Sequence, residues 1–143
     1  MDRRKFILDS CRACAALAAI PAIATLEGCG GAKALMLEPP EGSNTLDVPT
    51  SNFAKSSYVV VKTKKVGDDL LVAKQPDGSY KALVKRCTHK GGPLSVDGSD
   101  LKCSWHGSRF SMSGAVVNGP AAAPLKTYPA TLEGEVVKVD LGA

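Results

Sequence analysis

Histidine and aromatic residues are scarce in this chain of 143 residues, which contains two histidines, one tryptophan, three tyrosines and three phenylalanines. Two histidines are too few for a metalloenzyme with several metal sites, and the length fits one small domain rather than a cofactor domain beside a substrate domain. Cysteine occurs five times, and an odd number argues against a fold held by disulfides alone. The net charge of +4 comes without an arginine stripe or interleaved aromatics, which excludes a nucleic-acid partner.

The first 28 residues have the layout of a targeting segment rather than of a folded domain. Residues 2–7 are a basic start, and residues 13–26 are a run of mostly small apolar residues. A helix made of this run would span about 21 Å, short of the roughly 30 Å hydrocarbon core of a membrane. We therefore expect a removed export signal, with a retained membrane anchor as the alternative if the charges of Asp9 and Arg12 reach the interface.

Two features of this segment predict how the protein is exported and processed. Arg3 and Arg4 followed by Phe6 resemble a twin-arginine signal, which implies export of an already folded chain. Residues 26–29 resemble a lipoprotein cleavage box, which would make a lipidated Cys29 the first mature residue, while residues 22–24 offer an ordinary cleavage site instead. The expected location is the periplasm or the outer face of the cytoplasmic membrane, with attachment through the lipid or the amino-terminal segment.

A domain over residues 47–143 is expected to follow a flexible tether over residues 29–46, which contain two successive prolines and the sequence Gly-Ser-Asn. The domain is predicted to be all-β, because short β-branched runs alternate with turn residues and no window of 11 or more residues after position 30 has a helical period. This spacing predicts a small antiparallel sandwich or barrel. The expected strands are residues 58–61, 70–73, 80–85, 126–132 and 135–141.

Residues 86–124 differ from the rest of the domain because they are rich in glycine, serine and proline and lack long apolar runs. A stretch of this kind is usually functional or disordered, and this one holds both histidines and two of the five cysteines. Cys87 and His89 lie in one short loop, and Cys103 and His106 lie in a second. Two sulfur and two nitrogen donors form a complete set of four metal ligands.

The spacing of these donors favours a cofactor over a single metal ion. Glycines after each histidine, Gly91 and Gly107, let the backbone fold close to a metal centre and turn its amide groups toward anionic sulfur. A zinc ion is one alternative, although structural zinc ligands usually stand about two to four residues apart and Cys87 and His89 are closer in sequence. A disulfide between Cys87 and Cys103 is another, but it would leave both histidines unexplained.

The pattern Cys-x-His followed by Cys-x-x-His-Gly resembles the signature of Rieske iron–sulfur proteins, over about residues 47–141. The resemblance implies a small antiparallel β-fold with a loop-rich cluster-binding subdomain and one [2Fe–2S] cluster per chain. In that family two cysteines hold one iron and two histidines the other, which here pairs Cys87 with Cys103 and His89 with His106. Residues 119–124 correspond to the family's proline-rich loop over the cluster. The residues expected around the cluster are Gly91, Gly92, Trp105, Gly107, Ser108, Phe110 and Pro120.

The sequence departs from the cytochrome bc type of this family at positions that tune the reduction potential. That type has one further cysteine in each loop, joined in a disulfide, and here Gly92 and Trp105 occupy those positions. Ser108 stands where a serine donates a hydrogen bond to cluster sulfur, but Phe110 replaces a tyrosine that donates another. Fewer donors stabilise the added electron less, so we expect a potential below the top of the family's range of roughly −150 to +300 mV.

Three functions are compatible with the resemblance, and counting removes one of them. An oxygenase would need two further histidines for its mononuclear iron. The preferred expectation is a membrane-tethered one-electron carrier in which histidine protonation accompanies electron uptake, with a redox protein or a quinol as its partner. The alternative is the Rieske subunit of a quinol-oxidising, cytochrome bc-like or other multi-subunit oxidoreductase. The missing disulfide cysteines and the short apolar run favour the carrier.

Overall fold

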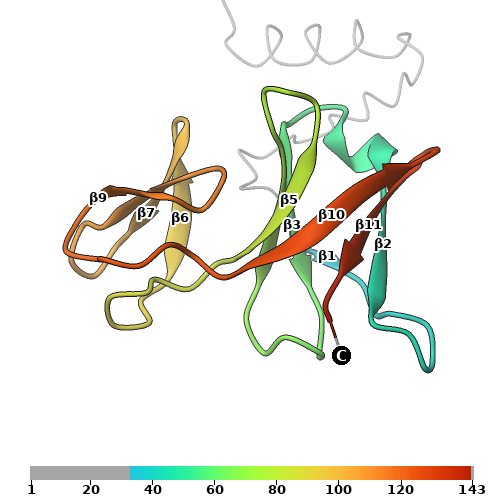
Figure 1. The fold of residues 1–143 in the computed structure, drawn as a ribbon, viewed down its shortest axis with the longest axis horizontal. Coiled ribbons are helices and arrows are strands. Elements are labelled where there is room, and N and C mark those ends of the chain that lie inside the picture. The colour runs from blue at the N-terminus through green and yellow to red at the C-terminus, as the bar shows by residue number, and fades with distance from the viewer. Residues whose placement is uncertain (1–32, 143) are drawn as a thin grey trace, which may run out of the picture. The chain divides into compact units, whose positions relative to one another are not determined.

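The computed structural model describes residues 33–142, whose eleven strands fall into two sheets (Figure 1). The predicted export signal, the twin arginines and Cys29 lie outside these residues. The larger sheet has seven strands in the order β1-β3-β4-β5-β10-β11-β2, and every pair in it is antiparallel except β1 with β3. Its strands are β1 (Leu35–Met36), β2 (Thr45–Pro49), β3 (Tyr58–Lys62), β4 (Leu70–Lys74), β5 (Tyr80–Val84), β10 (Thr127–Glu133) and β11 (Val136–Asp140).

A single short 3-10 helix, Thr50–Phe53, joins β2 to β3 within the described residues. The all-β prediction is therefore confirmed, and the expected strands of the larger sheet are present. In residues 33–142 no helix has the length and apolar character needed to span a membrane.

Strands β3 and β4 are buried on both faces, which explains why their sequences are continuous apolar runs rather than alternating ones. In β4, Leu70 and Val72 pack into one core, formed inside the curled larger sheet. Leu71 and Ala73 point the opposite way, into a second core. The larger sheet thus supports the smaller part of the molecule on its outer face.

The smaller sheet has four short strands in the order β6-β7-β8-β9, at the left of Figure 1. They are β6 (Leu94–Asp97), β7 (Asp100–Cys103), β8 (Arg109–Ser111) and β9 (Val116–Asn118). These strands were not predicted, since segments of three or four residues are too short for a measurable period. In the sequence, all four strands lie between β5 and β10. In the structure β5 and β10 pair directly with each other, and Leu83 lies opposite Thr127.

The second core joins the smaller sheet to the larger one. Leu101 and Phe110 of the smaller sheet are fully buried and share this core with Leu71 and Leu83. The amide of Gln75 adds a polar connection, because its Nε2 donates to the carbonyl oxygen of Met112 at 2.9 Å. The same core contains the two cysteines of the predicted ligand set, Cys87 and Cys103.

Over residues 33–46 the structure differs from the tether that was expected over residues 29–46. Leu35 pairs with Val61 in the sheet, and Glu38 accepts a hydrogen bond from the Lys64 amide at 3.0 Å. Thr45 and Leu46 already belong to β2, which pairs with β11 near the other end of the domain sequence, and the side chain of Leu46 is completely buried. The sequence of β2 contains little evidence of a strand, because only two apolar residues alternate there with polar and turn-forming ones. The strand is stabilised by its long-range pairing rather than by its own sequence.

Candidate metal centre

The first predicted loop is a tight turn that closes on itself. It follows β5, and the Arg86–Pro93 bridge joins its two ends. The Cys87 amide donates to the carbonyl oxygen of Gly92 at 2.9 Å, and the Gly91 amide donates to the carbonyl oxygen of Cys87 at 2.8 Å. Gly91 has a φ of 73°, a conformation that residues with a Cβ rarely adopt. These bonds place Cys87 at the buried base of the turn and His89 nearer the surface.

The second loop, between β7 and β8, repeats this hydrogen-bond pattern at the same offsets. The Cys103 amide donates to the carbonyl oxygen of Ser108 at 2.8 Å, and the Gly107 amide donates to the carbonyl oxygen of Cys103 at 3.1 Å. Gly107 also has a positive φ, 80°. The two loops are therefore equivalent turns, and His106 lies on the surface as part of the second.

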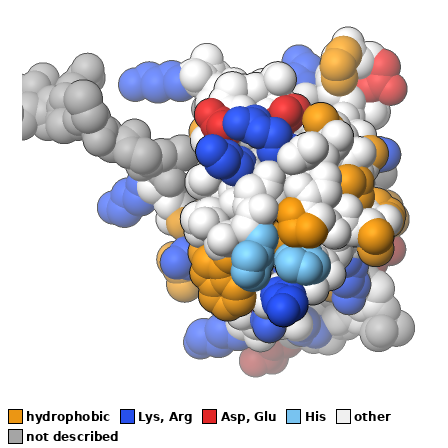
Figure 2. All heavy atoms as spheres, turned by 90° about the vertical axis from the view of Figure 1, so that its left-hand side faces the viewer, with side chains coloured by type: hydrophobic (Ala, Val, Ile, Leu, Met, Phe, Trp, Pro, Cys, Tyr) orange, Lys and Arg blue, Asp and Glu red, His pale blue; other side chains and the backbone are white. Residues whose placement is uncertain are grey.

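The turns bring like donors together. Cys87 and Cys103 are 3% and 2% exposed, and both belong to the second core. Both are free thiols, so the alternative of a disulfide between them is not supported. The rings of His89 and His106 are neighbours on the outer side, with centroids 5.0 Å apart and planes at 83° (Figure 2). Sulfur thus faces sulfur inside, and imidazole faces imidazole outside.

This arrangement fits a two-iron cluster better than one ion. Within residues 33–142 no three histidine, cysteine or acidic side chains gather around one point. A [2Fe–2S] cluster of the Rieske kind instead needs two thiolates at one iron and two imidazoles at the other. The Nδ1 atom of His89 is buried without a hydrogen-bond partner, a state that costs about 1–3 kcal/mol and that a metal bond would relieve. The residues present therefore fit the cluster.

The surroundings of Cys103 favour the thiolate, the form that binds iron. Burial raises the pKa of its thiol, but hydrogen bonds from the backbone amides of Trp105 and His106 and from the Cys87 thiol outweigh this and leave the pKa below its ordinary value. The backbone of the second loop therefore favours negative charge on the Cys103 sulfur.

Gly92 and Trp105 meet where the two loops touch. A Cβ at Gly92 would lie 2.8 Å from Sγ of Cys103 and 2.9 Å from Cγ of Trp105, so only glycine fits without displacing a neighbour. Trp105 covers this point and is 58% exposed. The two positions that carry the disulfide in the cytochrome bc type are thus neighbours here, and the indole ring occupies the space between the loops.

Two hydroxyl groups attach the proline-rich loop, residues 119–124, to the two turns. Ser108 is fully buried, and its Oγ accepts a hydrogen bond from the Ala121 amide at 3.0 Å. Thr88 lies between two predicted ligands, and its Oγ1 donates to the carbonyl oxygen of Ala123 at 2.6 Å. Sequence reasoning missed Thr88, although its place between Cys87 and His89 was the available signal. Pro120 is exposed in this loop, while Phe110 is completely buried and brings no hydroxyl.

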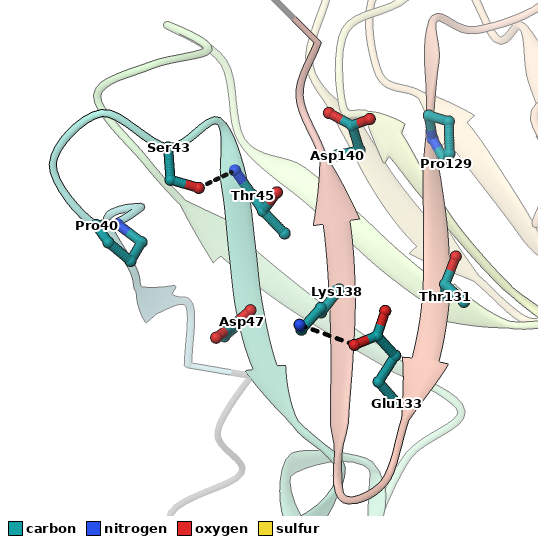
Figure 3. Close-up of a pocket in the computed structure, with 9 residues that line it drawn as sticks. All are labelled: Pro40, Ser43, Thr45, Asp47, Pro129, Thr131, Glu133, Lys138 and Asp140. Carbon is teal, nitrogen blue, oxygen red and sulfur yellow. Dashed lines mark hydrogen bonds and ion pairs between the residues drawn. The ribbon is translucent and has the colours of Figure 1, made fainter.

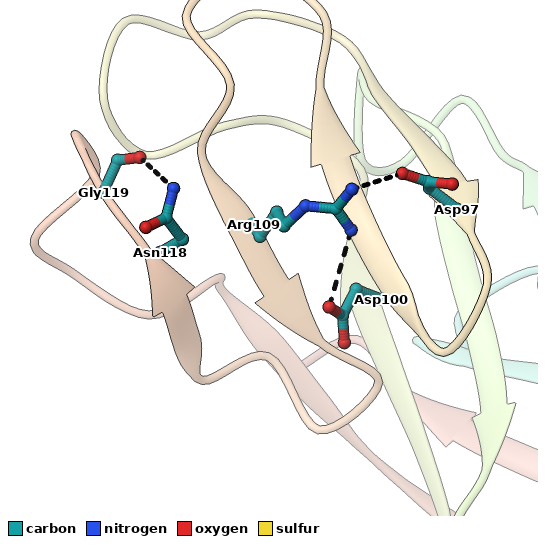
Figure 4. A network of polar contacts seen from close by, with 5 residues as sticks. All are labelled: Asp97, Asp100, Arg109, Asn118 and Gly119. Atoms are coloured by element: carbon teal, nitrogen blue, oxygen red, sulfur yellow. Dashed lines mark hydrogen bonds and ion pairs between the residues drawn. The ribbon is translucent and has the colours of Figure 1, made fainter.

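Arg109 is a second residue that the sequence did not reveal. Its guanidinium pairs with Asp97 and also with Asp100, at 3.6 Å, and so connects β8 to both ends of the turn between β6 and β7 (Figure 4). It directly follows Ser108, so this ion-pair network supports the strand that carries the second loop into the core.

A polar hollow elsewhere on the molecule offers no such donors. It lies over β2, β10 and β11, where the Nζ atom of Lys138 pairs with Glu133 at 2.8 Å (Figure 3). Its lining contains neither cysteine nor histidine.

Known proteins are similar to this chain in sequence and in fold. Residues 45–129 match the family model of the Rieske [2Fe–2S] domain. The ferredoxin component of the p-cumate 2,3-dioxygenase system of Pseudomonas putida is 38% identical over 72 residues, which are 47% of this chain and 61% of that protein. The iron–sulfur subunit of the cytochrome b6-f complex of Chlorobaculum thiosulfatiphilum is 28% identical over 103 residues, 68% of this chain and 57% of that subunit. The chain thus spans about three fifths of the length of these curated relatives.

Among solved structures, a cyanobacterial plasma membrane Rieske protein from Synechocystis is similar, with a TM-score of 0.58 and 26% identity. The similarity covers 65% of this chain and 96% of that one. The family model, the relatives and the fold agree with the donor geometry, and the predicted [2Fe–2S] cofactor is the one that this family binds. The chain belongs to the Rieske [2Fe–2S] family.

Proposed function

We propose that this chain is a one-electron carrier whose cluster is held by Cys87, Cys103, His89 and His106. The main observation in favour of the proposal is that the two donor types are separated in space. The cysteines are buried inside, and the adjacent histidine rings lie at the surface. When bound, a [2Fe–2S] cluster supplies a centre that accepts and returns one electron. Family membership and relatives that serve in electron transfer support the same function.

The chain's own residues divide the remaining tasks. The second core excludes water from the cysteine side, where Phe110 is completely buried. Ser108 and Thr88 hold the proline-rich loop in place by their hydrogen bonds to it. On the opposite side, the edges of the histidine rings provide the short route to a partner, because His106 is exposed.

We also propose that a proton binds at this imidazole edge when an electron is gained. Added negative charge near a histidine favours its protonated form. As the pH rises above the point at which the oxidised protein releases this proton, the midpoint potential should fall by about 59 mV per pH unit. The slope has this value because one proton accompanies one electron. Protein-film voltammetry between about pH 6 and pH 11 measures this slope, and a potential independent of pH over that span would refute the coupling.

The direct test of the carrier proposal is EPR of the purified protein before and after reduction with dithionite. Reduction should produce the low average g value of a mixed-ligand [2Fe–2S] cluster, with two irons and two inorganic sulfides per chain. Variants Cys87→Ser and His106→Ala should lose the signal, whereas the control Lys81→Ala, on the exposed side of β5, should keep it. Zinc at one ion per chain with no EPR signal would refute the proposal.

We further propose that the protein works at the outer face of the cytoplasmic membrane, exported by its twin-arginine segment and attached through Cys29 or an uncleaved amino terminus. The support is the basic and apolar layout of residues 1–28. Cell fractionation of the wild type and of Cys29→Ser, with mass spectrometry of the amino terminus, tests this. A cytoplasmic, unprocessed chain would overturn it.

A second candidate is the Rieske subunit of a quinol-oxidising complex, which the similarity to a cytochrome b6-f iron–sulfur subunit over 68% of this chain favours. Reduction of the protein by quinol only in the presence of its membrane partners would support this candidate. Equal reduction by soluble redox proteins alone would support the carrier.

A further inference from the structure

Positive charge is concentrated in residues 85–126, the part of the domain that contains the two loops and is here called the cluster half. The remaining described residues are called the other half. Residues 85–126 contain six basic and two acidic side chains, a net charge of +4 with histidine neutral. The rest of residues 33–142 contains eight basic and nine acidic side chains, a net charge of −1. The small positive charge of the domain therefore comes entirely from one half.

The two acidic side chains of the cluster half form no ion pair with its exposed lysines Lys90 and Lys102. Asp97 and Asp100 both pair with Arg109, within the smaller sheet (Figure 4). Among the described residues, Lys90 and Lys102 have no carboxylate partner within ion-pairing distance, and both are exposed. Lys90 directly follows His89.

Exposed apolar surface also lies next to the histidines. Large hydrophobic residues are strongly exposed at only four positions of residues 33–142, and two of them, Trp105 at 58% and Val117 at 55%, belong to the cluster half. Trp105 adjoins His106 in sequence. Figure 2 shows hydrophobic side chains beside both histidines, a basic side chain directly below them, and basic side chains flanked by acidic ones further above. An apolar centre bordered by positive charge is typical of a surface that meets a protein partner.

We propose that the surface formed by His89, Lys90, Trp105 and His106, here called the histidine face, docks redox proteins that carry acidic side chains around an apolar patch. This inference rests on the proposed carrier function, because docking at this face would bring a partner's redox centre close to the imidazole edges. An anionic membrane would also attract the lysines, but it would cover those edges and block electron exchange. The charge complementarity therefore favours an acidic protein.

The magnitude can be judged from Coulomb's law. Reversing one lysine changes two units of charge, and at about 8 Å from a facing carboxylate in water this corresponds to about a fivefold change in the association rate. Ionic strength near 0.15 M shortens the reach of these charges to about 8 Å, so the effect is largest in dilute buffer. Docking at this face should therefore show both a charge-reversal effect and a steep salt dependence.

The test uses the cluster-loaded protein with two probes, an acidic blue-copper protein and a basic mitochondrial-type cytochrome c. Stopped-flow association with the acidic probe should slow as salt rises, and Lys90→Glu should slow it about fivefold in dilute buffer. The matched control Lys55→Glu, an exposed lysine of the other half, should change it by less than twofold. Carbodiimide cross-linking to the acidic probe should join Lys90 or Lys102, a readout independent of electron transfer.

Four outcomes would overturn the inference. These are a rate insensitive to salt, an equal loss in Lys55→Glu, cross-links confined to lysines of the other half, and preference for the basic probe. Tighter binding to phosphatidylglycerol vesicles than to the acidic probe would assign the face to lipid, and self-association that competes with the probe would assign it to a second copy. EPR of each variant separates the two levels of the argument. A cluster missing from the wild type would refute the carrier function, whereas an intact cluster in the wild type and in the lysine variants with charge-insensitive docking would refute only this inference.

Discussion

Substitution of Gly92 by alanine tests whether the two loops pack so closely that there is no space for a Cβ at this position. The added methyl group would lie 2.8 Å from Sγ of Cys103 and 2.9 Å from Cγ and Cδ2 of Trp105, distances at which something must move. Overpacking of this kind costs about 1–3 kcal/mol. The indole can shift because Trp105 is largely exposed, but Cys103 is buried and fixed by two backbone hydrogen bonds.

The expected result of Gly92→Ala is a loss of about 2 kcal/mol in the free energy of unfolding, with a lower cluster content after purification. Urea denaturation measures the first and iron and sulfide analysis the second. Adding Trp105→Ala removes two of the three close contacts and leaves the one to sulfur. If sulfur is the main obstacle, the double variant should recover less than half of the loss.

The control is Gly98→Ala. Gly98, unlike Gly92, has a positive φ, 65°, and a Cβ there would meet no atom within 4 Å, so its cost of about 1–2 kcal/mol comes from backbone strain alone. It should destabilise the fold without reducing the cluster content. A Gly92→Ala variant as stable and as fully loaded with iron as the wild type would refute the steric argument.

Three further substitutions probe the same neighbourhood. Phe110→Tyr should raise the reduction potential in protein-film voltammetry if its hydroxyl reaches cluster sulfur; an unchanged potential with a loss of about 1–3 kcal/mol in stability would mean that the hydroxyl is buried without a partner. Ser108→Ala should lower the thermal midpoint, since the Ala121 amide loses its acceptor and a bond of this kind is worth about 1 kcal/mol; an unchanged melting curve would contradict this. The double variant Gly92→Cys with Trp105→Cys should form a disulfide, detected by thiol titration and mass spectrometry. It should also raise the potential, whereas two free thiols in the oxidised protein would show that the loops are not close enough.

That the two cysteines and the two histidines lie in two matching turns was predictable from sequence, because the information for each turn is local. Cys87 and His89, like Cys103 and His106, are close neighbours in the chain, and the glycines beside them mark the turns that the structure contains. The hairpin of β4 and β5 was predictable for the same reason, since the turn residues between two apolar runs specify it.

Long-range partners were not predictable. β2 pairs with β11 across most of the domain sequence, and its two buried residues, Leu46 and Val48, could as well have belonged to a loop. The bonds that Thr88 and Arg109 make depend on segments brought close only by folding, the proline-rich loop for one and the turn between β6 and β7 for the other. A side chain's type can be read from a sequence, but its partner across the fold cannot.

The direct pairing of β5 with β10 has a consequence for how such a protein can change. In hydrogen-bonding terms residues 85–126 form the loop of a hairpin, since the Val84 amide donates to the carbonyl oxygen of Lys126 at its base. Lengthening a loop is cheap, because each doubling costs only about 0.6 kcal/mol in closure entropy. Residues on the outer surface of this redox unit can therefore be inserted or exchanged while the larger sheet, and the second core that it shares with the unit, stay intact. The charge of the unit and its choice of partner can then evolve separately from the stability of the scaffold.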